Sequence, residues 1–481
     1  MKKIPEALAD YESDIGGTME LKISVLSDEE KKLVHNKTME ILETTGIWVK
    51  SPVAFDMLKK AGARTDDERQ IVYFTEEMVR DALDKAPKSF KLGGRNHSFD
   101  VVVPSENSHH IMSGIATSIY DIETGVKRDA VISDIVDIGR VFQKAETGAV
   151  CWTGVTASDV PQKTHNLHEM AAIISGTSKH VQVELSSTYE SPYAARILKA
   201  VCGSREKVKE DKIASFLYCP VSPLTQDRKM LEAYLALADY EIPVSIYPMP
   251  MIGLTSPASL FSTLCQNNAE VLSAMVIFET AHPGWPLIYG TASGATNPMT
   301  GEYVRGGEAP LISLAWTEMA RFYGLPCQVI GGGSVETMPA YLGGPDLIDG
   351  IGCIECGMAV DLPMILVDEE IGKRCMRIRK GINTARGGDL TEDIFKEGPG
   401  GNYLLHRSTM KNFRNNDEIY HNMTFPLGRR AQIDERSVNR EAALAIVKSI
   451  LAGPHEDALP EEIRITIENI LKEADEGISE L

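Results

Sequence analysis

Four aromatic residues stand near the ends of short apolar segments, where their rings could line a common cavity: Trp152, Tyr218, Tyr247 and Tyr289. Ring faces that converge on one cavity attract a quaternary ammonium group by cation–π interaction, with about 0.5–2 kcal/mol for each favourable contact. The competing interpretation is that each ring simply packs between a strand and a helix. We hypothesise that the four residues together form an aromatic site for a cation.

Two acidic residues are candidates for the counter-charge of such a cation. Glu184 stands near a segment end, and Glu270 closes the polar run QNNAE inside a helical pattern. A carboxylate close to a bound cation stabilises it by Coulomb attraction. For each acid, a hydrogen-bonded structural role is the alternative interpretation.

The eight cysteines include one Cys-x-x-Cys pair, formed by Cys353 and Cys356. With Cys327 and Glu355, this pair could form a zinc site that activates a thiol or an alcohol. A structural zinc site would need a second pair at matching spacing, so core thiols are the alternative. Eight cysteines are too few for a disulfide framework, and we expect free thiols. The absence of G-x-S-x-G, P-loop and HExxH motifs leaves acyl transfer, NTP chemistry and zincin chemistry without support.

Four basic residues follow a Gly-rich turn and contrast with the acidic chain around them: His406, Arg407, Lys411 and Arg414. Such a cluster could orient an acidic partner or the tail of a cofactor. A helix face that is simply solvated is the alternative interpretation.

The chain has 481 residues and a net charge of −19, from 49 Lys and Arg against 68 Asp and Glu. Hydrophobic residues make up 43% and charged residues 24%, which is typical of a globular protein. The acidic excess argues against nucleic acid and anionic membranes as partners. The N-terminus lacks the apolar run of a signal peptide, and no segment is apolar enough to span a bilayer. We therefore expect a cytoplasmic protein.

After Gly93, short apolar strands alternate with amphipathic helices. Eight strands are predicted, at residues 111–119, 149–155, 180–185, 213–219, 243–249, 286–291, 327–331 and 347–354. Eight such repeats over residues 111–381 predict an α/β fold, the (β/α)₈ TIM barrel, for which roughly 250 residues are typical. A doubly wound sheet would need a Gly-rich phosphate turn after its first strand, and none follows Ile111. In a barrel, the site lies at the carboxyl ends of the strands.

Two further modules flank the predicted barrel. Residues 1–110 form a helical N-terminal module, whose helices begin at Ser or Thr and end at Gly or Pro. Residues 382–481 form a C-terminal extension, with a Gly-rich loop and two helical runs, REAALAIVKSILAG and PEEIRITIENILKEADEG. We expect these last helices to clasp the barrel or a neighbouring subunit.

Several motifs occur in the order found in one known family, namely ILETTGIWV, YDIETGVKRDA, CPVSPL, IPVSIYPMPMIGLTSP, ILVDEEI and GPGGNYLL. Across nearly its whole length the chain resembles the trimethylamine methyltransferase superfamily of corrinoid-dependent TIM-barrel enzymes. The resemblance implies transfer of a methyl group from an amine to the cobalt(I) of a separate corrinoid protein. The barrel mouth would receive that corrinoid.

The position that matches the family's pyrrolysine is Gly333 here, so the chain resembles the non-pyrrolysine members, which act on betaines. A quaternary ammonium already carries a neutral amine as leaving group and needs no covalent activator, so Gly333 would leave that space open. The resemblance suggests glycine betaine, proline betaine, carnitine and γ-butyrobetaine as substrates. A betaine carboxylate needs Arg, His or amide donors, and the nominees are Arg305, Asn297, Gln328 and His406.

The leading hypothesis is a quaternary amine:corrinoid protein Co-methyltransferase that forms a homo-oligomer and binds no metal of its own. The four aromatic residues would bind the cation, and Glu270 would tune the field around it. One alternative is a zinc-dependent corrinoid methyltransferase that uses Cys327, Cys353 and Cys356. Another is a barrel that binds quaternary amines without turning them over.

Overall fold

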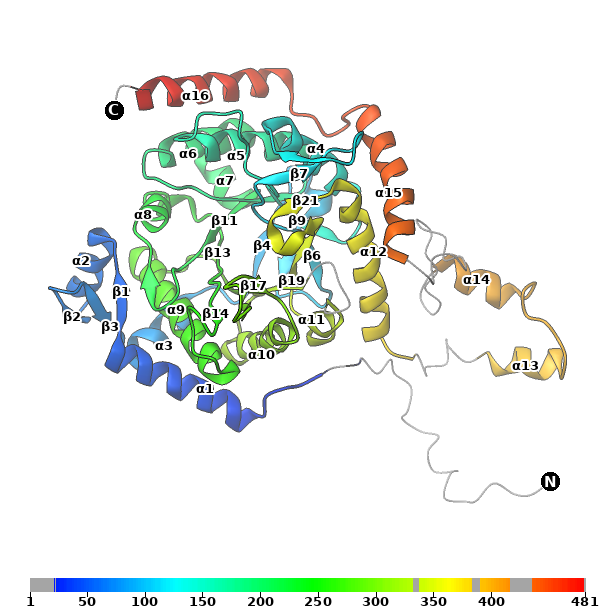
Figure 1. The fold of residues 1–481 in the computed structure, drawn as a ribbon, viewed down its shortest axis with the longest axis horizontal. Coiled ribbons are helices and arrows are strands. Elements are labelled where there is room, and N and C mark those ends of the chain that lie inside the picture. The colour runs from blue at the N-terminus through cyan, green and yellow to red at the C-terminus, as the bar shows by residue number, and fades with distance from the viewer. Residues whose placement is uncertain (1–20, 22, 332–336, 383–389, 416–434, 480–481) are drawn as a thin grey trace.

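Eight parallel strands close into a barrel, and an outer layer of helices surrounds it (Figure 1). The computed structural model describes residues 21, 23–331, 337–382, 390–415 and 435–479. The closed order runs through β6 (His109–Met112), β9 (Gly148–Trp152), β10 (His180–Val183), β11 (Ala214–Tyr218), β13 (Val244–Ile246), β15 (Leu287–Thr291), β18 (Cys327–Ile330) and β19 (Leu347–Ile351), which returns to β6. The predicted TIM barrel is therefore confirmed, with a strand at each of the eight predicted places.

The barrel strands are buried on both faces, which explains their nearly continuous apolar runs. Parallel partners that are in register point their side chains to the same face, and successive residues point to opposite faces. Tyr218 is in register with Ile246, and Ile246 with Tyr289. All three side chains therefore share one face, whereas Tyr247 faces the other way.

Eight helices follow the barrel strands: α4 (Ile132–Phe142), α5 (His165–Gly176), α6 (Ser191–Cys202), α8 (Lys229–Leu235), α9 (Leu260–Ala281), α10 (Glu308–Tyr323), α11 (Thr337–Gly343) and α12 (Leu362–Arg379). A further short helix, α7 (Arg205–Asp211), precedes β11. Helix α9 is buried over most of its length because α1 and α3 of the N-terminal module cover its outer side. The polar run of α9 is hydrogen-bonded in this buried position, because Asn267 donates to Thr291 of β15 and Asn268 donates to Thr38 of α1.

The N-terminal module contains the helices α1 (Asp28–Glu40), α2 (Pro52–Lys60) and α3 (Glu76–Lys85). Ser27 and Glu30 form a capping box that fixes the start of α1, as its sequence predicted. The module also contains a hairpin of β4 (Phe90–Leu92) and β5 (Val101–Val103) and three strands of a small sheet that was not predicted, namely β1 (Ile47–Val49), β3 (Ile71–Tyr73) and β2 (Arg64–Asp66). The fourth strand of this sheet, β12 (Thr225–Gln226), comes from the loop after β11 of the barrel and pairs with β1. Strands of two or three residues depend on a distant partner, so the local sequence pattern does not reveal them.

Two small sheets rise from the carboxyl ends of the barrel strands. One contains β7 (Ser118–Tyr120), β8 (Lys127–Asp129), β20 (Cys353–Ile354) and β21 (Ala359–Val360), and the other contains β14 (Met251–Ile252), β16 (Gly294–Thr296) and β17 (Tyr303–Val304). They form the walls of the barrel mouth.

The C-terminal extension contains α13 (Thr391–Glu397), α14 (Arg407–Asn415), α15 (Glu435–Ala452) and α16 (Glu461–Ser479). Helix α15 packs against α12 and α4, and α16 packs along α6 and α5, so the two predicted helical runs do clasp the barrel of their own chain. The bidentate pair of Arg440 with Asp361 fixes α15 near the mouth walls. Within the described ranges, no helix is long and apolar enough to cross a membrane.

Candidate functional site

A tyrosine and an aspartate meet across the barrel mouth. The Tyr247 hydroxyl, just beyond β13, donates a hydrogen bond to Asp349 Oδ2 of β19 at 3.0 Å. The ring of Tyr247 lies over Gly290, where a Cβ atom would stand only 2.6 Å from Tyr247 Cδ2. A glycine at this point of β15 is therefore what lets the ring lie flat inside the barrel.

The second oxygen of Asp349 is buried and has no hydrogen-bond partner among the described residues. Burial raises the pKa of Asp349 to about 7, against the opposing effects of the Tyr247 hydrogen bond and the positive charge of Arg305. An unpartnered carboxylate oxygen in a buried position is costly unless a cation or donor binds it. The mouth therefore contains an acceptor that is available to a positively charged ligand.

A second acid, Glu184, follows β10 on the same inner face as Gln182. Burial, together with the charge of Glu169, raises the pKa of Glu184 to about 8. The thiol of Cys219 responds to both acids, because burial and then the charges of Glu184 and Asp349 raise its pKa far above the ordinary value. Cys219 thus lies within electrostatic reach of two inward carboxyl groups from opposite sides of the mouth.

Trp152 closes β9 at the wall of the mouth. Its ring packs on Gly114, where a Cβ atom would come within 2.1 Å of the indole. The indole Nε1 is buried and has no hydrogen-bond partner in the part of the chain that the structure describes, and the same holds for the hydroxyl of neighbouring Thr153. The predicted cation residues Trp152 and Tyr247 therefore both lie at the mouth end of the barrel.

Gln328 lies inside the barrel, one layer of side chains below Tyr247 and Asp349, and forms the floor of the mouth. Its Oε1 accepts hydrogen bonds from Ser245 Oγ at 2.7 Å and from Gln182 Nε2 at 3.5 Å. Its Nε2 is buried and has no partner among the described residues. This predicted substrate residue lies inside the barrel and offers a free amide donor.

Tyr218 and Tyr289 are not brought to the mouth. The Tyr218 hydroxyl donates to Gln226 Oε1 at 2.8 Å, and the Tyr289 ring stacks on Trp316 at 4.2 Å while its hydroxyl donates to Asn268 at 2.7 Å. Both rings fill the layer between strands and helices, because the strand pleat turns them outward. The packing interpretation, and not the cage, describes these two residues.

Glu270 lies on α9, outside the barrel. Its carboxylate accepts hydrogen bonds from Ser222 Oγ at 2.7 Å, Leu224 N at 2.9 Å and Gln266 Nε2 at 3.0 Å. Burial raises its pKa to about 7. Glu270 therefore holds the loop that follows β11, and its expected role in tuning the field around the cation stays a prediction.

Two other nominees lie elsewhere, and one is outside the described residues. Asn297 shapes the turn of the β16–β17 hairpin, where its Oδ1 accepts from Met299 N at 2.9 Å. His406 lies between α13 and α14, where its Nε2 is 3.3 Å from Glu397 Oε2. Gly333 falls in the range 332–336, outside the described residues.

Tyr303 and Arg305, on the hairpin that contains Asn297, complete one wall. The Tyr303 ring lies on Gly294, and its hydroxyl donates to Ala292 O at 3.3 Å. The pKa of Arg305 is raised overall. Burial lowers it, but the charges of Tyr303, Cys353 and Asp349 outweigh burial, so the guanidinium stays charged. Arg305, one of the nominated carboxylate ligands, therefore stands in the electrostatic neighbourhood of Asp349.

The three thiols of the zinc alternative do not come together. Cys327 begins β18 at the amino-terminal end of the barrel, where its N–H donates to Asp346, whereas Cys353 follows β19 at the mouth. Cys356 lies in an exposed turn, and Glu355 is engaged by Tyr120 and Lys127. All eight cysteines are free, as predicted, and no group of three or more metal-type side chains occurs among the described residues.

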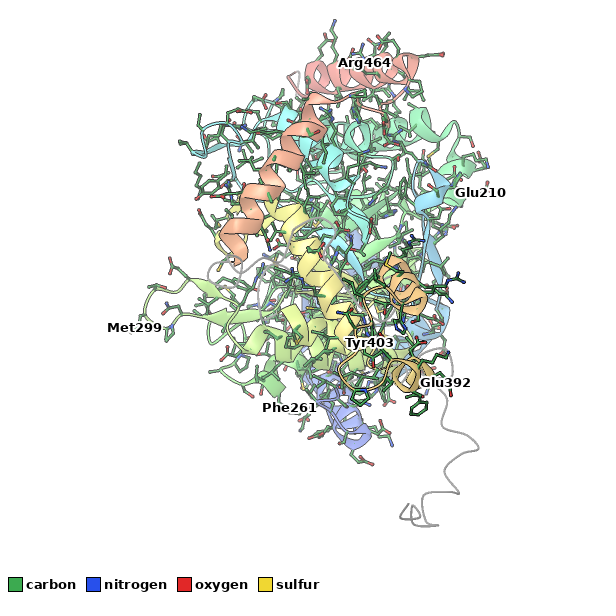
Figure 2. The ribbon with its side chains drawn as sticks, turned by 90° about the vertical axis from the view of Figure 1, so that its right-hand side faces the viewer. Glu210, Phe261, Met299, Glu392, Tyr403 and Arg464 are labelled. Atoms are coloured by element: carbon green, nitrogen blue, oxygen red, sulfur yellow. The ribbon has the colours of Figure 1, made fainter. Side chains whose placement is uncertain are left out.

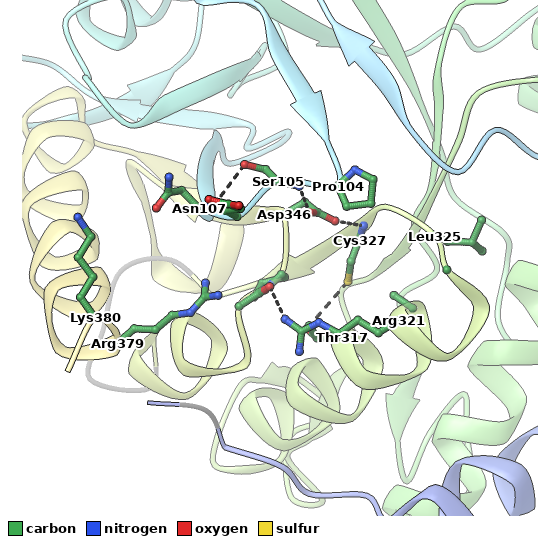
Figure 3. A pocket seen from close by; sticks show the side chains of 15 residues that line it. Pro104, Ser105, Asn107, Thr317, Arg321, Leu325, Cys327, Asp346, Arg379 and Lys380 are labelled. Carbon is green, nitrogen blue, oxygen red and sulfur yellow. Dashed lines mark hydrogen bonds between the residues drawn. The ribbon is translucent and has the colours of Figure 1, made fainter. Parts of the chain in front are cut away.

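A cavity of about 700 Å³ opens at the other end of the barrel (Figure 3). Asp346 holds its wall together by accepting hydrogen bonds from Ser105 N at 2.6 Å and Cys327 N at 2.7 Å. In TIM barrels this end contributes to stability, whereas chemistry occurs at the carboxyl ends of the strands. We therefore assign the candidate site to the mouth and not to this cavity.

Around the mouth, the loops expose large apolar side chains, which we call the apolar rim: Val126, Val221, Met249, Leu254, Met299 and Met358. Figure 2 shows Met299 at the outer tip of its hairpin. Such a rim suits the docking of a large, partly apolar group over the mouth.

Comparison with known proteins identifies the family of the chain. A sequence profile described as trimethylamine methyltransferase (MTTB) matches residues 17–477. The chain is 27% identical to the trimethylamine methyltransferase MttB of Desulfitobacterium hafniense, with 94% of each chain covered. It is 31% identical to MttB of Methanosarcina barkeri over 81% of this chain and 83% of that protein. It is also 27% identical to a glycine betaine methyltransferase of Desulfitobacterium hafniense, over 95% and 98% of the two chains. The chain therefore belongs to the trimethylamine methyltransferase family, and it is a methyltransferase.

Proposed function

We propose that this methyltransferase removes one N-methyl group from a betaine-type quaternary amine and passes it to the cobalt(I) of a partner corrinoid protein. The observation that carries the proposal is the pair of inward acids, Glu184 and Asp349, beside the rings of Tyr247 and Trp152. A similar protein named as a glycine betaine methyltransferase supports the choice of substrate class.

The cation is bound by rings and diffuse negative charge. A quaternary ammonium has no N–H to donate, so it gains little from a localised hydrogen bond and most from aromatic faces and carboxylates. The inner faces of Trp152 and Tyr247 provide the rings. Asp349, with one oxygen free of partners among the described residues, provides the closest counter-charge.

The negative end of a betaine requires a different partner. Arg305 is the charged donor on the mouth wall near Asp349, and its planar guanidinium can bind both oxygens of a carboxylate. Gln328 Nε2 adds a neutral donor at the floor of the barrel. The mouth therefore offers acids and rings for a cation and separate donors for a carboxylate. A zwitterion whose two charges are one to a few carbons apart suits this arrangement.

The reaction itself needs orientation more than proton transfer. The N–CH₃ bond breaks, its electron pair stays on the amine nitrogen, and the methyl carbon bonds to cobalt. The corrinoid supplies the nucleophile for this displacement. The protein's residues hold the methyl group in line toward the mouth and exclude water, and orientation of this kind can contribute about 7–11 kcal/mol.

The test is a panel of glycine betaine, proline betaine, carnitine, γ-butyrobetaine and trimethylamine, each incubated with the protein and a cobalt(I) corrinoid. The absorption spectrum of the corrinoid reports methylation. Methyl transfer from a betaine, and not from trimethylamine, is the expected result. Binding of a betaine by calorimetry, without transfer to its own reduced corrinoid protein, would instead identify a non-catalytic binder.

A further inference from the structure

Two glutamine side chains meet inside the barrel, below the mouth. Gln182 of β10 donates through Nε2 to Gln328 Oε1 of β18 at 3.5 Å and to Ser215 Oγ at 3.4 Å. Strands β10 and β18 are not neighbours in the closed barrel, so the bond between the two amides crosses its interior. Both bonds are longer than the usual length of about 2.9–3.0 Å, so they hold the amide of Gln182 only weakly.

Each of these amides leaves one polar atom without a hydrogen-bond partner among the described residues. The two atoms are Gln182 Oε1, an acceptor, and Gln328 Nε2, a donor. Facing carboxamides can form two reciprocal hydrogen bonds, and only one is made here. The side chains are 1% and 0% exposed, so bulk water does not satisfy the remaining atoms. Such a pair costs free energy unless a bound group fills it.

This result does not depend on which way the two amides are turned. Turning both over exchanges the oxygen and the nitrogen of each side chain. The bond between Gln182 and Gln328 then runs in the opposite direction, and one donor and one acceptor are again left over. The barrel interior therefore offers a matched donor and acceptor in either case.

The open part of the mouth ends directly above these two amides. Along a strand, the next residue on the same face lies two positions further on, about 6.6 Å away. That residue is Glu184 above Gln182 and Ile330 above Gln328, and both are half-buried, whereas the amides beneath them are buried. A group that enters the mouth can therefore reach the amides from above.

A hydroxyl is the group that satisfies both free atoms. It can accept the hydrogen bond from Gln328 Nε2 and donate its own hydrogen to Gln182 Oε1. A carboxylate only accepts, so it would leave Gln182 Oε1 unpaired and place a negative charge beneath Asp349. The carboxylate of a betaine is therefore left to Arg305 on the wall above.

The distance between the predicted cation site and the amides limits where the hydroxyl stands on the substrate. The Tyr247 ring lies on Gly290, and Gly290 is in register with Gln328. The cation and the amides are thus about one layer, or about 6.6 Å, apart. A hydrogen bond covers about 2.8 Å of this step. A link of two carbons between the nitrogen and the hydroxyl covers the rest.

We propose that Gln182 and Gln328 form a hydroxyl-binding subsite, and that the preferred substrate is a quaternary amine with a hydroxyl two carbons from its nitrogen. The inference rests on the proposed function and narrows its substrate class. With the hydroxyl held below and a carboxylate held by Arg305, the ammonium group lies uppermost and turns a methyl group out of the mouth. The subsite thereby contributes to the orientation on which the methyl transfer depends.

The test uses two pairs of ligands that differ only in one hydroxyl: carnitine with γ-butyrobetaine, and choline with ethyltrimethylammonium. Calorimetry gives the Kd of each ligand for the wild type, Gln182→Met and Gln328→Met. Methionine keeps the length of the glutamine side chain and removes its amide. Gln226→Met is the matched control, because Gln226 is an equally buried glutamine whose amide bonds to Tyr218, Glu270 and Ser273 outside the barrel. Thermal unfolding verifies that each variant folds.

The wild type and Gln226→Met are expected to bind the hydroxylated member of each pair at least about tenfold more tightly, and the two inner variants to reduce this ratio below about threefold. Equal Kd values within both pairs for the wild type would overturn the inference, whatever the variants do, and would leave the proposed function standing. A preference that both inner variants keep would overturn it as well. A wild type that binds no member of either pair would refute the proposed function together with the inference.

Discussion

Tyr247 and Asp349 are joined by a hydrogen bond of 3.0 Å that spans the barrel mouth from β13 to β19. The bond leaves Asp349 Oδ1 without a partner among the described residues, in a site that Trp152 and Glu184 also face. The tyrosine thereby orients the acid, and its hydrogen bond partly opposes the rise in pKa that burial causes.

Removing the Tyr247 ring weakens substrate binding, whereas changing an outward tyrosine does not. Tyr247→Ala loses a cation–π contact worth about 0.5–2 kcal/mol, so the Kd for the quaternary amine rises about two- to thirtyfold. Tyr218→Phe loses only its bond to Gln226 and leaves the Kd unchanged, although the melting temperature falls. Calorimetric titration of both variants checks this. Equal losses of affinity in the two variants would refute the inward assignment of Tyr247.

Substrate binding strengthens as the pH rises through 7 to 8. The pKa of Asp349 is raised to about 7 and that of Glu184 to about 8, so both acids are neutral below this window and ionised above it. A cation binds the ionised form more tightly, and its binding therefore releases protons. Titrations at pH 6 and 8.5, in two buffers of different ionisation enthalpy, measure both effects. A flat pH profile in the wild type would contradict the role of these acids.

Asp349→Asn stabilises the substrate-free protein. An acid whose folded pKa lies above its unfolded value loses stability as the pH rises from the unfolded to the folded pKa, so for Asp349 the cost is complete above about pH 7. The variant should therefore melt at a higher temperature than the wild type at pH 8, and with a smaller difference at pH 4. The Asp346→Asn variant is the control. Burial raises the pKa of Asp346 too, but its two oxygens accept hydrogen bonds from Ser105 N and Cys327 N, so the amide loses one acceptor and destabilises the protein.

Arg305→Gln separates the two ends of the substrate. Loss of a charge-assisted hydrogen bond costs about 1.5–3 kcal/mol, so the Kd for a betaine rises about ten- to hundredfold. The Kd for tetramethylammonium, which has no carboxylate, stays the same or falls because a positive charge leaves the mouth. Competition binding with the two ligands gives the ratio. A parallel loss for both ligands would show that Arg305 supports the structure and does not bind the carboxylate.

Glu270→Gln acts through the loop after β11. The carboxylate accepts three hydrogen bonds, from Ser222, Leu224 and Gln266, and an amide cannot replace all of them. We expect a loss of about 1–3 kcal/mol in unfolding free energy and a lower kcat, with the pH dependence of substrate binding unchanged. A shift of that pH profile would indicate instead that Glu270 tunes the field at the mouth.

The sequence predicts the barrel well because each β/α repeat has its own apolar periodicity and its own start and stop signals. The face of a strand is harder to predict. Tyr218 and Tyr289 point to the outer face of the barrel sheet, and Tyr247 points to the inner face. Which face a strand residue takes depends on how neighbouring strands are aligned. Ser245 is polar and lies inside the barrel. Tyr247 is two residues further along the chain, so it must share the inner face with Ser245.

Asp349 was not predicted because an aspartate in a short apolar segment disfavours a strand, and the local strand pattern around it is ambiguous. Arg305 was nominated from the sequence, whereas Tyr303 was not, because only the tertiary fold places their hairpin beside the mouth. The His406 cluster looked like a ligand site because the sequence shows its charges and not its distance from the barrel. Sites assembled from several strand ends therefore need the register before the residues can be grouped.

The most direct test is the single-turnover rate of methyl transfer from the preferred betaine to a cobalt(I) corrinoid, measured for wild type, Tyr218→Phe and the paired variant Tyr247→Ala with Asp349→Asn. The account predicts that Tyr218→Phe keeps the wild-type rate and that the paired variant loses about a hundredfold, the equivalent of about 2.7 kcal/mol. A paired variant that transfers the methyl group at the wild-type rate would show that the chemistry does not take place at this mouth.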